Sequence, residues 1–540
     1  MAENLRREDV QISERRPLHC ADRTSAASLE PYWPLGPMDH LVFPSVPIEV
    51  VFVYENPHAS SALPSSSLDE LLSTLRLEQA LSRLLDYYPH LTGRLHFYPD
   101  SRAPGISRLG TGAELFVADC VLRLDDLAAP GRGNGRILMP SLPDCGNALT
   151  PPFDPTLEGV CRDPIFAVQR TRFACGGVAL GVRLHHIVCD ASGFFQLVRH
   201  LAEIYRKLAT AQGPVLLSTP PEIRSFLRDP ALLSNAERQA ASAFRPSLFH
   251  LDESNGAGAG GPGPEAEAFE AGPIGPMPTG RVTGRVLRFT GPQLQELKER
   301  ATDPRGSTGW VSTFEALSAY LYQRVYRARV QLMHDRGEVP ASEIPACLSR
   351  GFFGSIELRG PTRLNLPEHY FPNAVAPLIL SDPPHELLMD GPLWQVSAAL
   401  HAVVRSFDPH HMEEELKWIA VQPDKSRIKV RFRFGGNFTV SQWSKHSMYC
   451  GMDFDADEGG NALAPVLVSP PLTDISRVDG LAFILSTEEE LHRATQHEGS
   501  RQRSPPSLDV NLTLMEHLWP ILAADEQFRQ YCCGESPTQQ

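Results

Sequence analysis

The stretch from His185 to Gly193, HHIVCDASG, determines how the rest of the chain is interpreted. It follows an alternating apolar run from Val178 to Leu184 and precedes an amphipathic run from Phe194 to Leu208. The first pattern predicts a strand and the second predicts a helix. The stretch therefore lies at a strand-to-helix junction. A histidine held at the end of a strand can act there as a general base.

Other segments predict mixed α/β structure around this junction. Phe166 to Phe173 and the glycines that follow predict the first arm of a β-hairpin that ends at Leu184. Ile48 to Tyr54 predicts a strand, and the leucine-rich periodicity from Leu68 to Tyr88 predicts a helix. Ser312 to Glu315 matches a capping box that opens a helix running to about Val330.

The length of 540 residues exceeds what one hydrophobic core usually supports, so two domains are expected. The segment from Ser254 to Gly280 is rich in Gly, Pro, Ala and Glu and predicts a linker. We therefore expect an N-terminal domain at 1–225, a crossover segment with the linker at 226–285, and a C-terminal domain at 286–540.

Charge and cysteine usage exclude several classes of protein. The net charge of −14 argues against binding to nucleic acid or to an anionic membrane, because both need a basic surface. No apolar run is long enough to span a membrane, and no apolar signal core follows the N-terminus. The ten cysteines form no CxxC pair, which predicts reduced thiols in a cytoplasmic protein.

The H-x-x-x-D pattern of His186 and Asp190 carries little weight alone, since about one chance match is expected in a chain of this length. The structural alternative is a partly buried histidine followed by a helix cap, which Asp190 or Ser192 could supply.

The surrounding motifs make the pattern specific. Leu84 to Leu95 is similar to an L-x-x-YYP-x-AGRL segment, and Ser312 to Ala319 matches an S-x-x-E-x-L-x-A helix. Arg359 to Pro367 and Tyr370 to Val375 resemble an arginine- and proline-rich segment followed by YFGNAV. In this order the motifs resemble the BAHD family, the HxxxD acyl-CoA-dependent acyltransferases of plants and fungi. The resemblance implies two chloramphenicol-acetyltransferase-like α/β domains, with mixed sheets flanked by helices, joined by a long crossover loop.

The resemblance also implies roles for individual residues. His186 would be the general base, and Asp190 of the same motif would be structural, paired with Arg359 from the second domain. Gly193 would allow the acyl donor to approach. Acyl-CoA would be the co-substrate, with no permanently bound cofactor and no metal.

One motif of the family departs from its pattern here. Where the family has DFGWG, this chain has Asp453-Phe454-Asp455-Ala456-Asp457, which lacks both glycines and the tryptophan. The resemblance implies that Asp453 supports the site structurally. The acidic cluster could also be read as a cation site, but we favour an exposed polar loop. For the oxyanion, the matching region offers Trp443 or a hydroxyl near Thr439 and Ser441.

The expected function is transfer of an acyl group, here acetyl, to a hydroxyl or amine of a small metabolite by a monomeric enzyme of secondary metabolism. Two alternatives stay open. One is a condensation-type enzyme that uses a carrier-protein thioester. The other is a non-catalytic relative that binds a metabolite or a protein, which the altered DFGWG segment favours.

Overall fold

The computed structural model describes residues 6–57, 70–128, 136–210, 213–252, 280–306, 309–433, 435–494 and 505–532. The linker expected at Ser254 to Gly280 lies, except for its last residue, outside these described residues.

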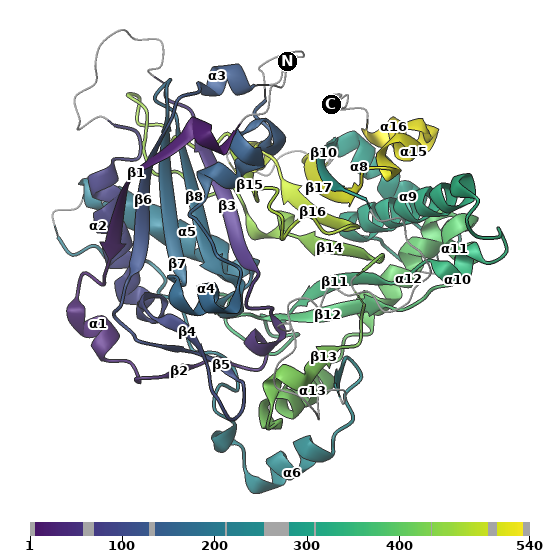
Figure 1. Cartoon of the computed structure of the whole chain (residues 1–540), viewed down its shortest axis with the longest axis horizontal. Coiled ribbons are helices and arrows are strands. Elements are labelled where there is room, and N and C mark those ends of the chain that lie inside the picture. Colours follow the sequence, from purple (N-terminus) through teal and green to yellow (C-terminus); the bar gives the residue numbers. More distant parts are fainter. Residues whose placement is uncertain are drawn as a thin grey trace.

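The N-terminal half is built on a six-stranded mixed sheet, drawn on the left of Figure 1. The predicted hairpin is its centre, where Phe166 pairs with Leu184 in antiparallel register. The side chains of Val178, Val182 and Leu184 share one buried face, as the alternation predicts. In spatial order the strands are β1 (Val10–Leu18), β6 (Ala113–Cys120), β7 (Phe166–Phe173), β8 (Val178–His185), β3 (Pro47–Tyr54) and β15 (Leu467–Ser469).

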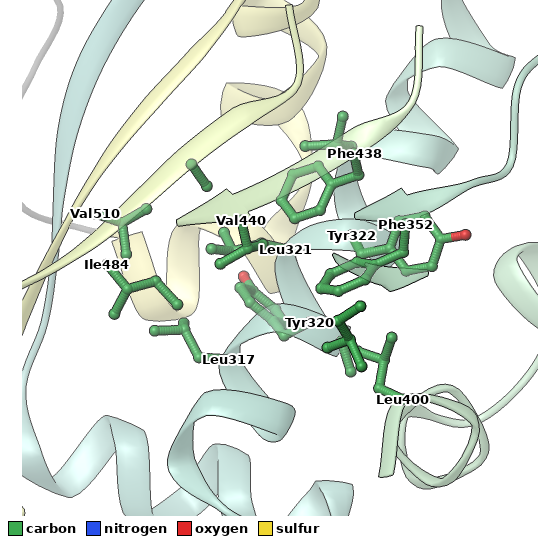
Figure 2. Close-up of a cluster of buried hydrophobic side chains, with 14 of the residues drawn as sticks. Leu317, Tyr320, Leu321, Tyr322, Phe352, Leu400, Phe438, Val440, Ile484 and Val510 are labelled. Atoms are coloured by element: carbon green, nitrogen blue, oxygen red, sulfur yellow. The ribbon is translucent and has the colours of Figure 1, made fainter. Parts of the chain in front are cut away.

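The C-terminal half is built on a second six-stranded mixed sheet, on the right of Figure 1. Its buried face packs against α9 (Thr313–Arg336), the helix that the capping box predicts. Figure 2 shows Leu317 and Leu321 of this helix beside Val440 and Ile484 of the sheet. In spatial order the strands are β10 (Val282–Phe289), β17 (Leu508–Met515), β16 (Leu481–Ser486), β14 (Phe438–Gln442), β11 (Phe352–Glu357) and β12 (Val375–Leu380).

Shorter elements surround the two sheets. The small sheets pair β9 (Phe249–Leu251) with β13 (Ile428–Val430), and join β2 (Trp33–Pro34), β5 (Pro104–Ser107) and β4 (Arg94–Phe97). The other α-helices are α1 (Arg23–Ala27), α2 (Thr74–Tyr87), α3 (Leu124–Leu127), α4 (Leu157–Arg162), α5 (Ala191–Thr210), α6 (Asn235–Ala243), α8 (Gly291–Ala301), α10 (Ile344–Cys347), α11 (His385–Met389), α12 (Leu393–Arg405), α13 (Pro409–Val421), α14 (Glu489–Ala494), α15 (Leu518–Ala524) and α16 (Glu526–Cys532).

Short 3₁₀ helices complete the regular structure of the described residues. They are η1 (Arg7–Asp9), η2 (Asp39–Leu41), η3 (Pro89–Thr92), η4 (Met139–Ser141), η5 (Pro143–Leu149), η6 (His186–Val188), η7 (Pro230–Leu232), η8 (Lys425–Arg427) and η9 (Ser444–His446). Among the described residues, no helix combines the length and the apolar character needed to cross a bilayer.

The C-terminal half contributes one strand to the sheet of the N-terminal half. β15 comes from the C-terminal half of the chain but pairs with β3, so that Val468 lies opposite Phe52 in the first sheet. The segment before β15 also packs on the first half, since Tyr449 and Phe454 are buried in its core. A division of the chain at a single linker therefore does not describe this segment.

The predicted α/β class with mixed sheets flanked by helices is confirmed. The start of α2 differs from the expectation, because this helix begins at Thr74. Leu72, just before it, has a φ of 47° and lies outside the helical region. Its N–H donates to Asp455 at 2.7 Å, so a distant loop contacts the backbone just before α2.

Candidate active site

The HHIVCDASG stretch forms the connection between β8 and α5. His185 is the last residue of β8, and the N–H of His186 donates to the carbonyl of Val46 at 3.3 Å. One turn of 3₁₀ helix, η6, then leads into α5. Strand pairing thus fixes the point at which His186 leaves the sheet, and the predicted strand-to-helix junction is confirmed.

The His186 ring is half-buried, and one of its nitrogens is committed to the turn itself. Nδ1 lies 3.0 Å from the carbonyl oxygen of Cys189. Because a carbonyl can only accept, Nδ1 carries the proton of the neutral ring and Nε2 keeps its lone pair. Burial lowers the pKa of His186, although backbone hydrogen bonds and the Asp190 charge oppose the shift. The ring is therefore neutral near pH 7, in the form that can remove a proton.

Asp190 is buried and uses both carboxylate oxygens elsewhere. Oδ1 accepts from the N–H of Gly193 at 3.1 Å and from Nη2 of Arg359 at 3.0 Å. Oδ2 accepts from Nη1 of Arg359 at 2.9 Å and from the N–H of Ala374 at 2.8 Å. Burial acts to raise the pKa of Asp190, but the Arg359 charge and these hydrogen bonds outweigh it and keep the pKa below its usual value.

Two interpretations of Asp190 from the sequence hold together in the structure. Its carboxylate caps the first turn of α5 through Gly193, and it forms a bidentate ion pair with an arginine 169 positions away. The contact with Arg359 that the resemblance implies is therefore present. None of the four hydrogen bonds comes from the His186 ring.

Arg359 is fixed on every side. Its Nε and Nη2 donate to the carbonyls of Tyr370 and Pro372, both at 2.9 Å. Nη1 also donates to Glu357 at 2.7 Å. The guanidinium thus binds the segment from Tyr370 onward and Asp190 at the same time, and it joins the second half of the chain to the first.

The space beside Gly193 is occupied by the protein itself. A Cβ at this position would lie 2.1 Å from the carbonyl oxygen of Phe371. The resemblance implies that the space beside Gly193 receives an acyl donor, but the Phe371 carbonyl occupies it. The missing side chain instead lets the Phe371 backbone pack against the first turn of α5.

Two residues at the site, Asp39 and Asn373, were not singled out by the sequence. Asn373, fully buried, donates through Nδ2 to the carbonyl of His186 at 3.0 Å and to Asp39 at 2.8 Å. Asp39 also accepts from Ser225 Oγ and from the N–H of Gly36. Asn373 lies within the Tyr370 to Val375 segment that resembles the family motif, so the resemblance could have pointed to it. Asp39 lies in none of the motifs quoted above.

The Asp453 loop is anchored to the first half. Asp453 forms an ion pair with Arg206 of α5 at 3.2 Å. The Phe454 ring is buried and packs edge-on between Tyr54 and Tyr205, with ring centroids 6.0 and 5.5 Å away. The expectation of a merely exposed polar loop is therefore wrong, because Phe454 anchors the loop in the first core.

The acidic side chains of this loop already have partners. Asp455 accepts from Leu72 N–H at 2.7 Å and pairs with Arg76 at 3.1 Å. Asp457 accepts from the N–H groups of Gly459 and Asn461. Among the described residues, no group of three or more His, Cys, Asp or Glu side chains is placed to hold a metal ion.

Three other residues considered from the sequence are largely buried. The indole N–H of Trp443, a candidate oxyanion donor, donates to Ser441 Oγ at 2.9 Å. Cys189 is fully buried, and burial raises the pKa of its thiol, so packing is its role, as expected. His185 is also fully buried, with its ring edge-on to Phe153.

The profile of a family described as "Transferase family" matches residues 10–244 and 265–475. The acyltransferase GLAUCE of Arabidopsis thaliana is 24% identical over 326 residues, which cover 58% of this chain and 60% of that protein. Shikimate O-hydroxycinnamoyltransferase of Nicotiana tabacum is 24% identical over 418 residues, which cover 76% of this chain and 80% of that protein.

The chain spans 60% of GLAUCE and 65% of the Dahlia pinnata malonyl-coenzyme A:anthocyanin 3-O-glucoside-6''-O-malonyltransferase, to which it is also similar.

Solved structures share the fold. Vinorine synthase superposes with a TM-score of 0.61 at 15% identity and covers 97% of this chain and 98% of its own. F. graminearum TRI101, complexed with coenzyme A and deoxynivalenol, gives 0.60 at 18% identity, with 93% and 98% covered. The expected two-domain architecture is confirmed by these likenesses, which at this identity show the fold alone.

Proposed function

Because the chain belongs to the Transferase family and resembles its BAHD acyltransferases, we propose that it moves an acyl group from an acyl-CoA thioester to a hydroxyl or amine of a small metabolite. The observation that carries the proposal is the state of His186. Its Nδ1 is committed to Cys189, and its lowered pKa leaves Nε2 unprotonated near pH 7. GLAUCE is named an acyltransferase and the Nicotiana tabacum relative a hydroxycinnamoyltransferase, which supports the same reaction class.

In the proposed reaction His186 is the only proton carrier. Nε2 removes the proton from the acceptor hydroxyl or amine as that atom attacks the thioester carbonyl carbon. A tetrahedral oxyanion forms, and its collapse breaks the carbon–sulfur bond. The imidazolium returns the proton to the departing thiolate. The products are the acylated acceptor and free coenzyme A.

In the proposed mechanism four residues keep His186 in position without contacting the substrate. They are Asp190, Arg359, Gly193 and Asp453. Asp190 caps α5 and fixes the end of the turn through Arg359. Because Gly193 has no side chain, the Phe371 backbone packs against the first turn of α5. Asp453 binds its loop to α5 through an ion pair with Arg206. Precise placement of one base matters because the rate of transfer falls steeply with misalignment.

The proposal includes acetyl as the acyl group, an acceptor from secondary metabolism, and a monomer in the cytoplasm with no permanently bound cofactor. In support of a reducing compartment, Cys20, Cys120, Cys145, Cys161, Cys175, Cys189, Cys347 and Cys450 are all free thiols.

The test is release of free thiol from acetyl-CoA and longer acyl-CoA thioesters with a panel of alcohols and amines. We expect acceptor-dependent release by the wild type and a loss of about 10²- to 10⁴-fold in His186→Ala. His410→Ala, an exposed histidine on α13, is the matched control and should match wild type. Release only from an acyl carrier protein would favour the condensation-type alternative. No release from any donor would favour a non-catalytic binding protein.

A further inference from the structure

Asn373 connects the turn that carries His186 to a second buried carboxylate. Its Nδ2 donates to the His186 carbonyl at 3.0 Å and to Asp39 Oδ1 at 2.8 Å, and its backbone N–H donates to the same oxygen at 3.2 Å. Both partners of Nδ2 can only accept. The NH₂ group must therefore face them, and the orientation of the amide is determined.

The other end of this amide has no partner. Oδ1 of Asn373 is buried and accepts no hydrogen bond from the described part of the chain. An unpaired buried acceptor costs roughly 1–3 kcal/mol, so it needs an explanation. The Asn373 side chain is also among the groups that raise the pKa of His186. An amide oxygen has this effect, since it stabilises a neighbouring imidazolium.

Asp39 fixes the amide in place. Its carboxylate is almost fully buried and accepts from Ser225 Oγ at 2.6 Å and from Gly36 N–H at 2.8 Å, besides the two Asn373 donors. These contacts join three distant segments at one carboxylate. The amide therefore has little freedom to rotate away from the His186 turn.

Asn373 and its neighbour bind both ends of the turn. Asn373 binds the carbonyl of His186, and the N–H of Ala374 binds Asp190 at 2.8 Å. Two consecutive residues of the second half thus position the base and the carboxylate of one motif.

We infer that Asn373, held by Asp39, is a positioning residue that orients the His186 turn and leaves its amide oxygen to stabilise the imidazolium formed during proton transfer. The inference rests on the proposed function for its consequence in turnover. Its effect on His186 is independent of turnover and is measured separately.

The first experiment titrates the His186 ring by NMR in protein labelled at histidine Cε1, with the signal assigned by its loss in His186→Gln. Asn373→Ala removes the amide oxygen and should lower the pKa of His186. In transfer assays the acid limb of kcat/KM should move to lower pH by the same amount, and kcat should fall by roughly tenfold to a hundredfold.

Asn511→Ala is the matched control. Asn511 is also buried, its Nδ2 donates to Ser469 Oγ at 3.0 Å, and its Oδ1 is unpaired among the described residues. Its loss should reduce stability and leave the titration of His186 unchanged. An equal shift in Asn511→Ala would overturn the inference.

If Asn373→Ala does not fold, a second variant tests the same inference. The double variant Asp39→Asn/Asn373→Asp keeps one carboxylate and one amide in reversed order, which avoids two facing charges. A carboxylate at position 373 should raise the pKa of His186, opposite to the alanine variant. Unchanged titration in whichever variants fold would overturn the inference. If the shifts occur without transfer from any donor, only the proposed function fails.

Discussion

Burial and one backbone contact give His186 the properties of a base. The Cys189 carbonyl selects the tautomer, and burial lowers the pKa of the ring. Asp190, four positions on, has its oxygens saturated by Arg359 and by backbone N–H groups. At the scale of single residues, the two members of the motif therefore have different roles. His186 is half-buried and keeps an unprotonated ring nitrogen, whereas Asp190 is buried and fully hydrogen-bonded.

The pH dependence of transfer follows from His186. A base must be unprotonated, so kcat/KM should rise with pH through the pKa of the free enzyme and then reach a plateau. Because burial lowers that pKa, the midpoint should lie below 6.5. The measurement is kcat/KM for thiol release across the acid range, with protein integrity followed by circular dichroism. A midpoint above 6.5 in folded protein would contradict this assignment.

At the scale of elements, a loop of the second half is bound to the start of α2. The loop around Asp455 binds the backbone just before α2, and its Phe454 ring is buried against β3 and α5. The segment keeps only two residues of the expected DFGWG motif. Its observed anchors are the phenylalanine and carboxylates paired with arginines.

Phe454→Ala should remove this anchor. Loss of a buried phenyl ring leaves a cavity and should lower the free energy of unfolding by about 3–5 kcal/mol. Urea unfolding followed by fluorescence measures the change. Ala456→Ser, at an exposed position of the same loop, should have little effect. Equal stability of Phe454→Ala and wild type would show that the loop does not anchor the two halves.

At the scale of the whole molecule, the two halves are joined by a strand and by a buried ion pair. β15 extends the first sheet, and Asp190 pairs with Arg359 across 169 positions of sequence. Removing one partner of a buried pair leaves an uncompensated charge, whereas removing both does not.

Asp190→Asn should therefore lower the free energy of unfolding by about 3–5 kcal/mol. The double variant with Arg359→Met should lose less than the sum of the single variants. The native pKa of Asp190 lies below its unfolded value of about 3.9, so the stability it contributes is present above that pH and is lost as pH falls through the native pKa. The cost of Asp190→Asn should thus be constant near neutral pH and shrink only below about pH 4. Additive single variants would contradict direct coupling.

Much of the framework could be predicted because it depends on local pattern. The period-2 apolar run from Val178 to Leu184 predicts β8, and the capping box at Ser312 predicts the start of α9, as the structure has them. Such patterns report which face a short segment buries, and that is decided within the segment itself. They say nothing about which distant segment supplies the other side of the contact.

The sequence by itself determined the α/β class, the junction that bears His186 and, through the order of its motifs, the family. Only the tertiary structure decided that β15 joins the first sheet, that Phe371 fills the space beside Gly193, and that Asp39 and Asn373 lie against the His186 turn. The physical reason is the long sequence separation between the segments that make these contacts. Hydrogen bonds and packing between segments hundreds of residues apart leave no periodicity in the chain, and they exist only when the whole core has formed.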